Sequence, residues 1–131
     1  MNDKCAADIM TRPVVTVAPE ALVIDAIQLL LRHHLSGLPV VRDGDRLVGI
    51  ITEHDIMNLA LSGNAADTRV EEAMTAPVVS LPPEADLGTL IDCLSSRRLR
   101  RVPIVRDGRV IGIVSRRDVL REMLFMYAKY H

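Results

Sequence analysis

A hydroxyl residue followed three positions later by an aspartate occurs twice in this chain, each time at the end of a short apolar run that opens with glycine. The two stretches are GIITEHD (Gly49 to Asp55) and GIVSRRD (Gly112 to Asp118). This spacing is typical of a capping box, in which a hydroxyl and an acid satisfy free N–H groups at a helix start. A carboxylate there can also accept hydrogen bonds from both ribose hydroxyls, and the positive end of the helix favours a phosphate. The pattern therefore leaves two interpretations open: a copied helix start, or two binding sites.

The charged residues inside the two stretches differ. The first has Glu53 and His54, and the second has Arg116 and Arg117. An arginine at a helix start can take a phosphate by a two-pronged contact, whereas a glutamate repels it. His54 would help only when protonated, below about its ordinary pKa of 6.5. We therefore expect the second stretch to be the stronger phosphate binder.

The two stretches belong to a longer internal repeat. MTRPVVTVAPEA (Met10 to Ala21) matches MTAPVVSLPPEA (Met74 to Ala85), and LPVVRDGDRLVGIITEHD then matches VPIVRDGRVIGIVSRRD with one residue fewer in the turn. Self-similarity over such a length indicates one structural unit written twice. The repeat predicts two halves, 1–65 and 66–131, joined by the polar connector SGNAADT (Ser62 to Thr68).

Each half predicts the element order β-α-β-β-α and hence an α+β fold. PVVTV and PVVSL are β-branched runs typical of strands. Pro19-Glu20 and Pro83-Glu84 suit the first turn of a helix. The Asp-Gly that splits each later apolar run favours a β-hairpin. A second helix should follow each hairpin, over Glu53 to Leu61 and over Arg116 to about Tyr130. Apolar residues at helical spacing define the first helix of each half: Val23, Ala26, Ile27 and Leu30, and Leu87, Leu90, Ile91 and Leu94.

Together these motifs resemble a tandem pair of CBS domains, a Bateman module, over nearly the whole chain from about Cys5 to Leu124. The resemblance implies two repeats related by a pseudo-twofold axis, with small sheets packed together, helices outside and two clefts between the copies. It also implies a regulatory sensor, not an enzyme, that binds AMP, ADP, ATP or S-adenosylmethionine as a regulatory ligand and has no obligatory cofactor. With nothing fused to the module, its output would pass to a separate effector protein of unknown identity or to its own assembly.

The resemblance also assigns residues to the two sites. Asp55 and Asp118 would hold ribose, Thr52 and Ser115 would contact ribose or phosphate, and His54, Arg116 and Arg117 would lie beside the phosphate. Gly37 allows close backbone approach to a purine, whereas its counterpart Arg101 is bulky and obstructs the second pocket. The purine pockets would be lined by Thr16, Val17, Ser36, Gly37, Leu38 and Pro39, and by Ser80, Leu81, Arg100, Arg101, Val102 and Pro103.

Composition restricts the class of protein. The chain has 131 residues, a net charge of −1, and one Phe and two Tyr as its only aromatics. Few aromatics disfavour base stacking on nucleic acid, and a balanced charge gives no general attraction to nucleic acid or membrane. The start of the chain lacks a signal-peptide pattern and no apolar stretch is long enough for a membrane span. Two cysteines do not form a disulfide scaffold. The sequence thus predicts a cytoplasmic protein without a membrane partner.

Three other features carry weaker alternatives. The basic run RRLRR (Arg97 to Arg101) fits a solvated helix end, with phosphate or nucleic-acid binding less favoured. His33-His34 are adjacent and face different ways on a helix, so we expect no metal site. The last helix carries an apolar stripe of Val119, Leu120, Met123, Leu124 and Tyr127, with Phe125 and Met126 beside it. Either the stripe completes the core, or part of it meets a second copy in a homodimer. A ligand-free dimeric interaction module is therefore the main rival to a nucleotide sensor.

Overall fold

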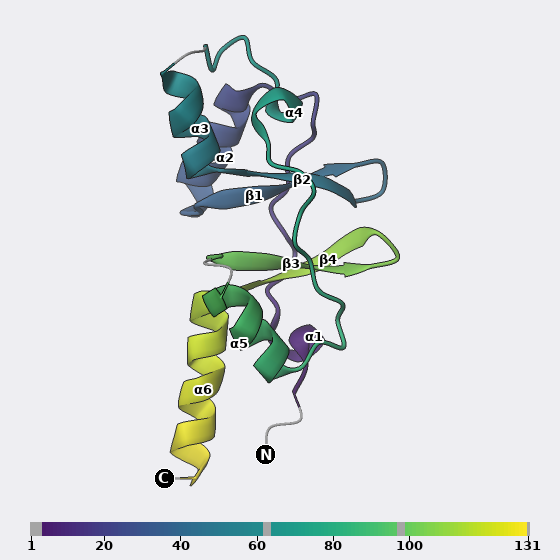
Figure 1. Ribbon diagram of the computed structural model, residues 1–131, viewed down its shortest axis with the longest axis vertical. Helices are drawn as coiled ribbons and strands as arrows, with labels where there is room; N and C mark the ends of the chain where they lie inside the picture. Colours follow the sequence, from purple (N-terminus) through teal and green to yellow (C-terminus); the bar gives the residue numbers. More distant parts are fainter. Residues whose placement is uncertain (1–3, 62–63, 97–98, 131) are drawn as a thin grey trace. The chain divides into compact units, whose positions relative to one another are not determined.

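The computed structural model describes residues 4–61, 64–96 and 99–130, and Figure 1 shows its helices and strands. The chain forms two compact units. One consists of Met1–Val14 with Val79–His131, and the other of Val15–Val78. These units differ from the halves expected from the repeat, because the opening segment of each sequence copy packs on the hairpin of the other copy.

Each unit is built on one antiparallel hairpin, as the Asp-Gly signals predicted. In Val15–Val78 the hairpin is β1 (Gly37–Arg42) and β2 (Arg46–Thr52), and in the other unit it is β3 (Arg101–Arg106) and β4 (Arg109–Ser115). Asp107 and Gly108 have φ values of 52° and 79° in the two-residue turn of the second hairpin. Positive φ at both positions is what a type I′ turn requires, so the missing residue of the second repeat falls in the turn.

The first helix of each repeat begins four positions later than expected. These helices are α2 (Val23–His33) and α5 (Leu87–Ser96), so the expectation of Pro19 and Pro83 in a first helical turn was wrong. Carboxylates further along the chain satisfy the free amides instead. Asp25 accepts from the amide of Leu22 at 3.2 Å, and Asp86 accepts from the amide of Thr89 at 2.8 Å. Hydrogen bonds from the Thr89 side chain and backbone hold the pKa of Asp86 below its usual value.

The β-branched runs ahead of these helices are shorter as strands than expected. Each forms one parallel bridge, at Val17 onto β1 and at Leu81 onto β3. Val17 donates to the Pro39 carbonyl at 3.1 Å and accepts from the Val41 amide at 3.0 Å. The bridging residue is the last one of each run, and proline, which cannot donate to a ladder, follows it within two residues and limits the pairing.

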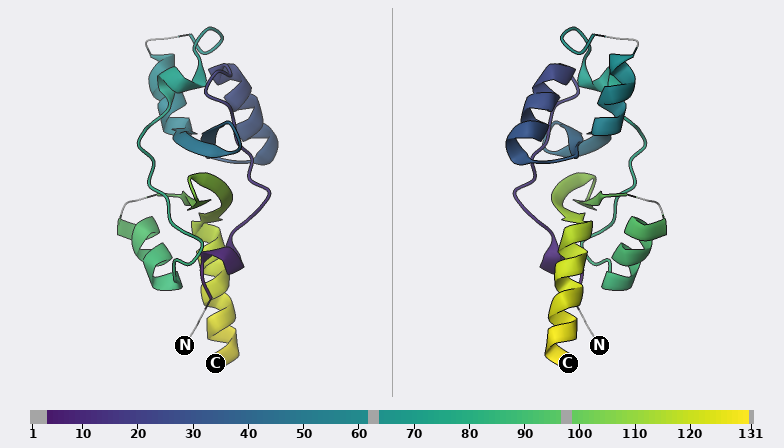
Figure 2. Two further views of the ribbon diagram at one scale, coloured as in Figure 1. Left: turned by 90° about the vertical axis from the view of Figure 1, so that its right-hand side faces the viewer. Right: turned by 90° about the vertical axis from the view of Figure 1, so that its left-hand side faces the viewer.

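The second helices confirm the prediction from the sequence. They are α3 (Glu53–Ala60) and α6 (Arg116–Tyr130). Two four-residue helices, α1 (Ala6–Ile9) and α4 (Val70–Ala73), were not expected. Within each unit the helices cover one face of the hairpin, and Figure 2 shows α1 against the side of α6.

Each unit has its own aliphatic core. In Val15–Val78 the core consists of Val17, Val23, Ala26, Leu30, Leu38, Val40, Ile51 and Val70. In the other unit it consists of Ala6, Ala85, Leu87, Leu90, Cys93, Leu94, Val102, Ile104, Val114 and Val119. Ala6 in the second list and Val70 in the first show how the opening segments complete the cores. Across the described ranges, no helix combines the length and the apolar character that crossing a membrane requires.

Candidate functional site

The start of α3 is a complete capping box. The Asp55 carboxylate accepts from the Thr52 amide at 2.9 Å and from the Thr52 hydroxyl at 3.0 Å, both through Oδ2. In return, Thr52 Oγ1 accepts from the Asp55 amide at 3.3 Å. The Glu53 amide is satisfied by the carbonyl of Ser36 at 2.9 Å. The hydroxyl-x-x-Asp pattern therefore has a structural role, as the capping interpretation predicted.

The start of α6 repeats this geometry. Asp118 Oδ2 accepts from the Ser115 amide at 2.8 Å and from the Ser115 hydroxyl at 3.0 Å, and Ser115 Oγ accepts from the Asp118 amide at 3.2 Å. The Arg116 amide donates to the Arg100 carbonyl at 3.0 Å. Asp118 is buried, whereas Asp55 is half-buried. The two helix starts thus differ in exposure more than in geometry.

The other oxygen of each carboxylate binds a threonine that the sequence analysis missed. Thr75 Oγ1 donates to Asp55 Oδ1 at 3.0 Å, and Thr11 Oγ1 lies 3.4 Å from Asp118 Oδ1. Arg121 adds a second donor to Asp118 Oδ1 at 3.2 Å. The sequence signal for this contact is the Met-Thr pair that opens each copy, Met10-Thr11 and Met74-Thr75.

Those methionines explain the glycines of the two repeated stretches. A Cβ at Gly49 would overlap Met74 Sδ and lie 3.0 Å from its Cγ. A Cβ at Gly112 would overlap Met10 Sδ and lie 2.6 Å from its Cγ. Two contacts therefore hold each opening segment in place: its methionine packs against a glycine of the hairpin, and its threonine hydroxyl donates to the aspartate at the following helix start.

The hairpin brings the expected purine-pocket residues next to these helix starts. Gly37 is paired with Thr52, and Arg101 with Ser115, at the open ends of the two hairpins. A Cβ at Gly37 would lie 3.2 Å from the Thr52 methyl group, so this close approach favours glycine. Thr16 and Ser80 precede the bridging residues Val17 and Leu81 on the neighbouring segment. All three parts of each expected site therefore lie within one unit.

Several of the expected pocket residues face the core. Leu38, Pro39, Val102 and Pro103 are fully buried. The carbonyls of Pro39 and Pro103 already accept from Val17 and Leu81. Gly37 is also buried, whereas Ser36 and Arg101 are half-buried and Arg100 is exposed.

The basic residues of the second site play different roles. The Arg116 side chain lies against α5 and the segment after it: its Nη2 donates to the carbonyl of Leu94 in α5 at 3.3 Å, and its Nε to the carbonyl of Leu99, beyond the helix, at 2.6 Å. Arg117 is exposed and has no hydrogen-bond or ion-pair partner among the described residues. Arg100 is exposed and Arg101 half-buried, while Arg97 and Arg98 lie outside the described residues. In the first site, His54 Nε2 lies 3.3 Å from Asn58 Nδ2.

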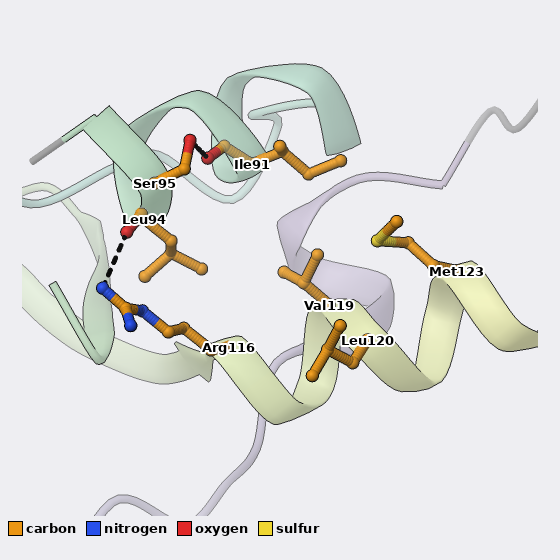
Figure 3. Close-up of a pocket in the computed structure, with 7 residues that line it drawn as sticks. All are labelled: Ile91, Leu94, Ser95, Arg116, Val119, Leu120 and Met123. Carbon is orange, nitrogen blue, oxygen red and sulfur yellow. Dashed lines mark hydrogen bonds between the residues drawn. The ribbon is translucent and has the colours of Figure 1, made fainter. Parts of the chain in front are cut away.

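A groove that sequence reasoning did not anticipate lies between α5 and α6. Its volume is about 420 Å³, and Figure 3 shows the side chains around it. Except for Ser95 and Arg116 the lining is apolar: Ile91, Leu94, Val119, Leu120 and Met123. Neither Asp118 nor Arg117 lines it. The groove is therefore separate from the hydroxyl and carboxylate pair at the start of α6.

The apolar stripe expected on the last helix is mostly exposed. Val119 is buried, but Leu120, Met123, Leu124 and Tyr127 are not. The buried face of α6 instead presents Asp118, Val119 and Glu122, and Glu122 pairs with Lys4 at 3.2 Å. The interpretation that this stripe completes the core was therefore wrong, apart from Val119.

His33 and His34, at the end of α2, are both exposed. Within the ranges that the structure describes, no group of three or more His, Cys, Asp or Glu side chains is placed to hold a metal ion.

Comparison with known proteins identifies the fold. The chain is 33% identical over 126 residues to inosine-5'-monophosphate dehydrogenase of Methanocaldococcus jannaschii, covering 95% of this chain but about a quarter (25%) of that enzyme. CBSX2, a CBS-pair protein from Arabidopsis thaliana solved in complex with AMP, has a TM-score of 0.86 at 29% identity, with 95% of this chain and 98% of that chain covered. The CBS domain pair of protein MJ0100, solved with 5'-methylthioadenosine and S-adenosyl-L-methionine, has a TM-score of 0.84 at 28% identity, with 95% and 99% covered.

The match to the enzyme is thus a match to a minor part of its length. The model of the CBS domain family matches this chain twice, over residues 6–62 and 70–125. Each match contains one hairpin and one of the repeated hydroxyl-x-x-Asp stretches with the helix that it caps. The chain therefore belongs to the CBS domain family and carries two CBS domains.

Proposed function

We propose that this chain is a regulatory CBS pair that binds an adenine-containing ligand at the starts of α3 and α6. AMP, ADP and ATP are the first candidates and S-adenosylmethionine the next. Binding would change its conformation or assembly and so its affinity for an effector protein. Since the similarity to an enzyme covers only the CBS region, we propose a sensor and not a catalyst.

The observation that carries this proposal is the doubled placement of a hydroxyl and a carboxylate beside the open end of a hairpin. Gly37 and Thr52 are paired there in one unit, and Arg101 and Ser115 in the other. The ligands in the structures of CBSX2 and of MJ0100 support an adenine-containing ligand class. Carboxylates accept strong hydrogen bonds from hydroxyls, and ribose offers two adjacent ones.

Isothermal titration of the purified protein with AMP, ADP, ATP, S-adenosylmethionine and NADH tests the proposal. We expect binding by at least one adenine compound, and a loss of affinity of about tenfold or more at the altered site in Asp55→Ala and in Asp118→Ala, as expected when a charged acceptor is removed. Asp86→Ala is the matched control, because Asp86 caps α5 away from both helix starts. If none of the five compounds gives heat, the proposal fails.

The rival function is a dimeric interaction module that needs no ligand. The exposed apolar residues of α6 favour it: Leu120, Met123, Leu124, Phe125 and Tyr127. In the other repeat, Met57 of α3 and Leu61 just after α3 are exposed at the positions equivalent to Leu120 and Leu124. Because self-association and ligand binding use different residues, we propose that the sensor is also a homodimer through the α6 face.

A further inference from the structure

Hydrogen bonds from within the chain occupy most of the acceptor positions of the Asp55 carboxylate. An ionised carboxylate offers about four lone-pair positions, two on each oxygen. Oδ2 accepts from the amide and the hydroxyl of Thr52, which occupies both of its positions. Oδ1 accepts from Thr75 at 3.0 Å and from no other described residue. One position on Oδ1 is therefore open.

The Asp118 carboxylate has no such opening. Its Oδ2 is occupied by the amide and the hydroxyl of Ser115, and its Oδ1 by Arg121 at 3.2 Å and by Thr11 at 3.4 Å. At the position equivalent to Arg121 the first repeat has Asn58, which lies against His54 and not against Asp55. The two carboxylates thus differ by one donor.

We infer that Thr75 and Thr11 are built-in competitors for the ligand's ribose hydroxyls, and that Asp55 therefore accepts a ligand before Asp118 does. The inference rests on the proposed function and adds the order of binding and its cause. A single ligand hydroxyl fits on Asp55 without any rearrangement. A ribose that donates both hydroxyls must replace Thr75, a hydroxyl-for-hydroxyl exchange on the same acceptor. At Asp118 the same ribose must replace both Thr11 and Arg121.

The exchange also connects ligand binding to the opening segments of the two repeats. The Thr75 backbone is bonded to Ile50 in both directions, at 2.8 and 3.0 Å, and the Thr11 backbone to Ile113 in the same way, at 2.8 and 3.1 Å. Beside these backbone hydrogen bonds, the hydroxyl of each threonine adds a side-chain hydrogen bond to the carboxylate. When a ligand hydroxyl replaces the threonine on the carboxylate, this side-chain hydrogen bond is lost and the opening segment separates more readily from the hairpin. Ligand occupancy is thereby transmitted to the residues that precede each repeat's first helix.

The test is titration with AMP of the wild-type protein, Thr75→Val and Thr75→Ser. Valine keeps the shape of threonine without its hydroxyl, so the affinity of Thr75→Val for AMP at the first site should rise by roughly tenfold or more, because a competing hydrogen bond to a charged carboxylate is removed. Thr75→Ser, which restores the hydroxyl, should return the affinity to that of the wild type. Thr68→Val is the matched control, because the hydroxyl bond that it loses goes to the Asn64 carbonyl and not to a carboxylate.

A purely structural threonine would not give tighter binding when its hydroxyl is removed. Hydrogen exchange supplies a second measurement: AMP should accelerate exchange of the Thr75 and Ile50 amides in the wild type and not in Thr75→Val. Unchanged or weaker AMP binding by Thr75→Val, with the wild type binding normally, would overturn the inference and leave the proposed function intact. Filling of the Asp118 site first, seen as Asp118→Ala abolishing the tighter of two binding steps, would also overturn it. Absence of binding in every protein would refute both.

Discussion

The Thr75 hydroxyl donates to the Asp55 carboxylate at 3.0 Å, and these residues come from different sequence repeats. Thr11 and Asp118 form the equivalent pair with the roles of the repeats reversed, at 3.4 Å. Each repeat therefore supplies the hydroxyl that orients the other repeat's carboxylate. A change in one opening segment reaches the proposed site of the other repeat directly, without any intermediate element.

The energetic consequence can be measured with a double-mutant cycle. We expect Thr75→Val and Asp55→Ala to be coupled by about 1–2 kcal/mol in the free energy of unfolding, because a hydrogen bond to a charged group joins them. The cycle of Thr11→Val and Asp118→Ala should give a smaller value, since its bond is near the limit of hydrogen-bond distance. Urea unfolding of the four proteins in each cycle gives both numbers. Equal coupling in the two cycles would contradict this ranking.

Variants of Arg116 and Arg117 should have different effects, the first on the stability of the fold and the second on phosphate binding. Arg116→Ala removes one hydrogen bond to Leu94 in α5 and one to Leu99 beyond it, so we expect a loss of about 1–2 kcal/mol of stability. Arg117 is exposed and unpaired among the described residues, so Arg117→Ala should change stability by less than about 0.5 kcal/mol.

The ligand series distinguishes their roles. In titrations, Arg117→Ala should lower the affinity for ATP and AMP and leave the affinity for adenosine unchanged. If Arg117→Ala lowers the affinity for adenosine as much as the affinity for ATP, then the guanidinium does not bind the phosphate. If Arg116→Ala changes the affinity for ATP and not the midpoint of unfolding, then the hydrogen bonds of Arg116 to Leu94 and Leu99 do not contribute significantly to stability.

The sequence predicted the parts of this fold that depend on local chemistry. Asp107-Gly108 predicted a turn because few other residue pairs accept positive φ twice, and Ser115-x-x-Asp118 predicted a helix start because its bonds lie within one turn. Contacts between distant segments were not predictable in this way. Thr11 is 107 residues from Asp118, and no local pattern shows that a threonine after a methionine will meet that carboxylate.

The expected start of α2 and the interpretation of the α6 stripe as part of the core were wrong for a related reason. Pro19 suited a first helical turn, but the carboxylate of Asp25 caps the chain later. On α6 the apolar stripe looked like a buried face, but Lys4 provides a partner for Glu122, and that pairing allows the helix to bury Glu122 and expose Leu120. In both cases a charged side chain decided the outcome, against the preference of proline for a first turn at α2 and against the apolar period at α6.

The repeated glycines should not tolerate a side chain. Gly112→Ala would press a Cβ against Met10 at the sulfur and at Cγ, so we expect a loss of about 1–3 kcal/mol from overpacking. Gly49→Ala should cost less, because the Cγ of Met74 lies further from the added atom. Thermal unfolding measures both changes, and Met10→Ala combined with Gly112→Ala should recover part of the loss.

Gly88→Ala is the matched control for these variants. Gly88 is in α5, and the nearest atom to an added Cβ is Asp86 Oδ1 at 3.6 Å. Alanine favours the helix over glycine by up to about 1 kcal/mol, so this variant should be stabilised. A stabilised Gly112→Ala would show that the Met10 contact is not a tight one.

Acid should weaken the cap of α5. The pKa of Asp86 is held below its usual value by the hydrogen bonds from Thr89, so the ionised form is favoured in the folded state. A depressed pKa in the folded state contributes stability that is present above the unfolded value and is lost as the pH falls through the folded value. Titration of the Asp86 carboxyl by NMR should give a midpoint below 3.8, and Thr89→Val should raise it. A midpoint at or above 3.8 would contradict the bonded geometry.

Self-association should depend on the exposed face of α6. Light scattering at micromolar concentration should give twice the chain mass of 14.5 kDa if the proposed homodimer forms. Leu124 is 69% exposed in the ligand-free chain, so Leu124→Glu should leave the monomer's fold unchanged while placing a charge in an apolar interface. We therefore expect Leu124→Glu to sediment and scatter as a monomer with an unaltered circular dichroism spectrum. Leu61→Glu, at the equivalent position of the other repeat, tests whether α3 shares the interface. A dimer that survives Leu124→Glu would place the contact elsewhere, and a monomeric wild type would leave the ligand sites as the only proposed means of signalling.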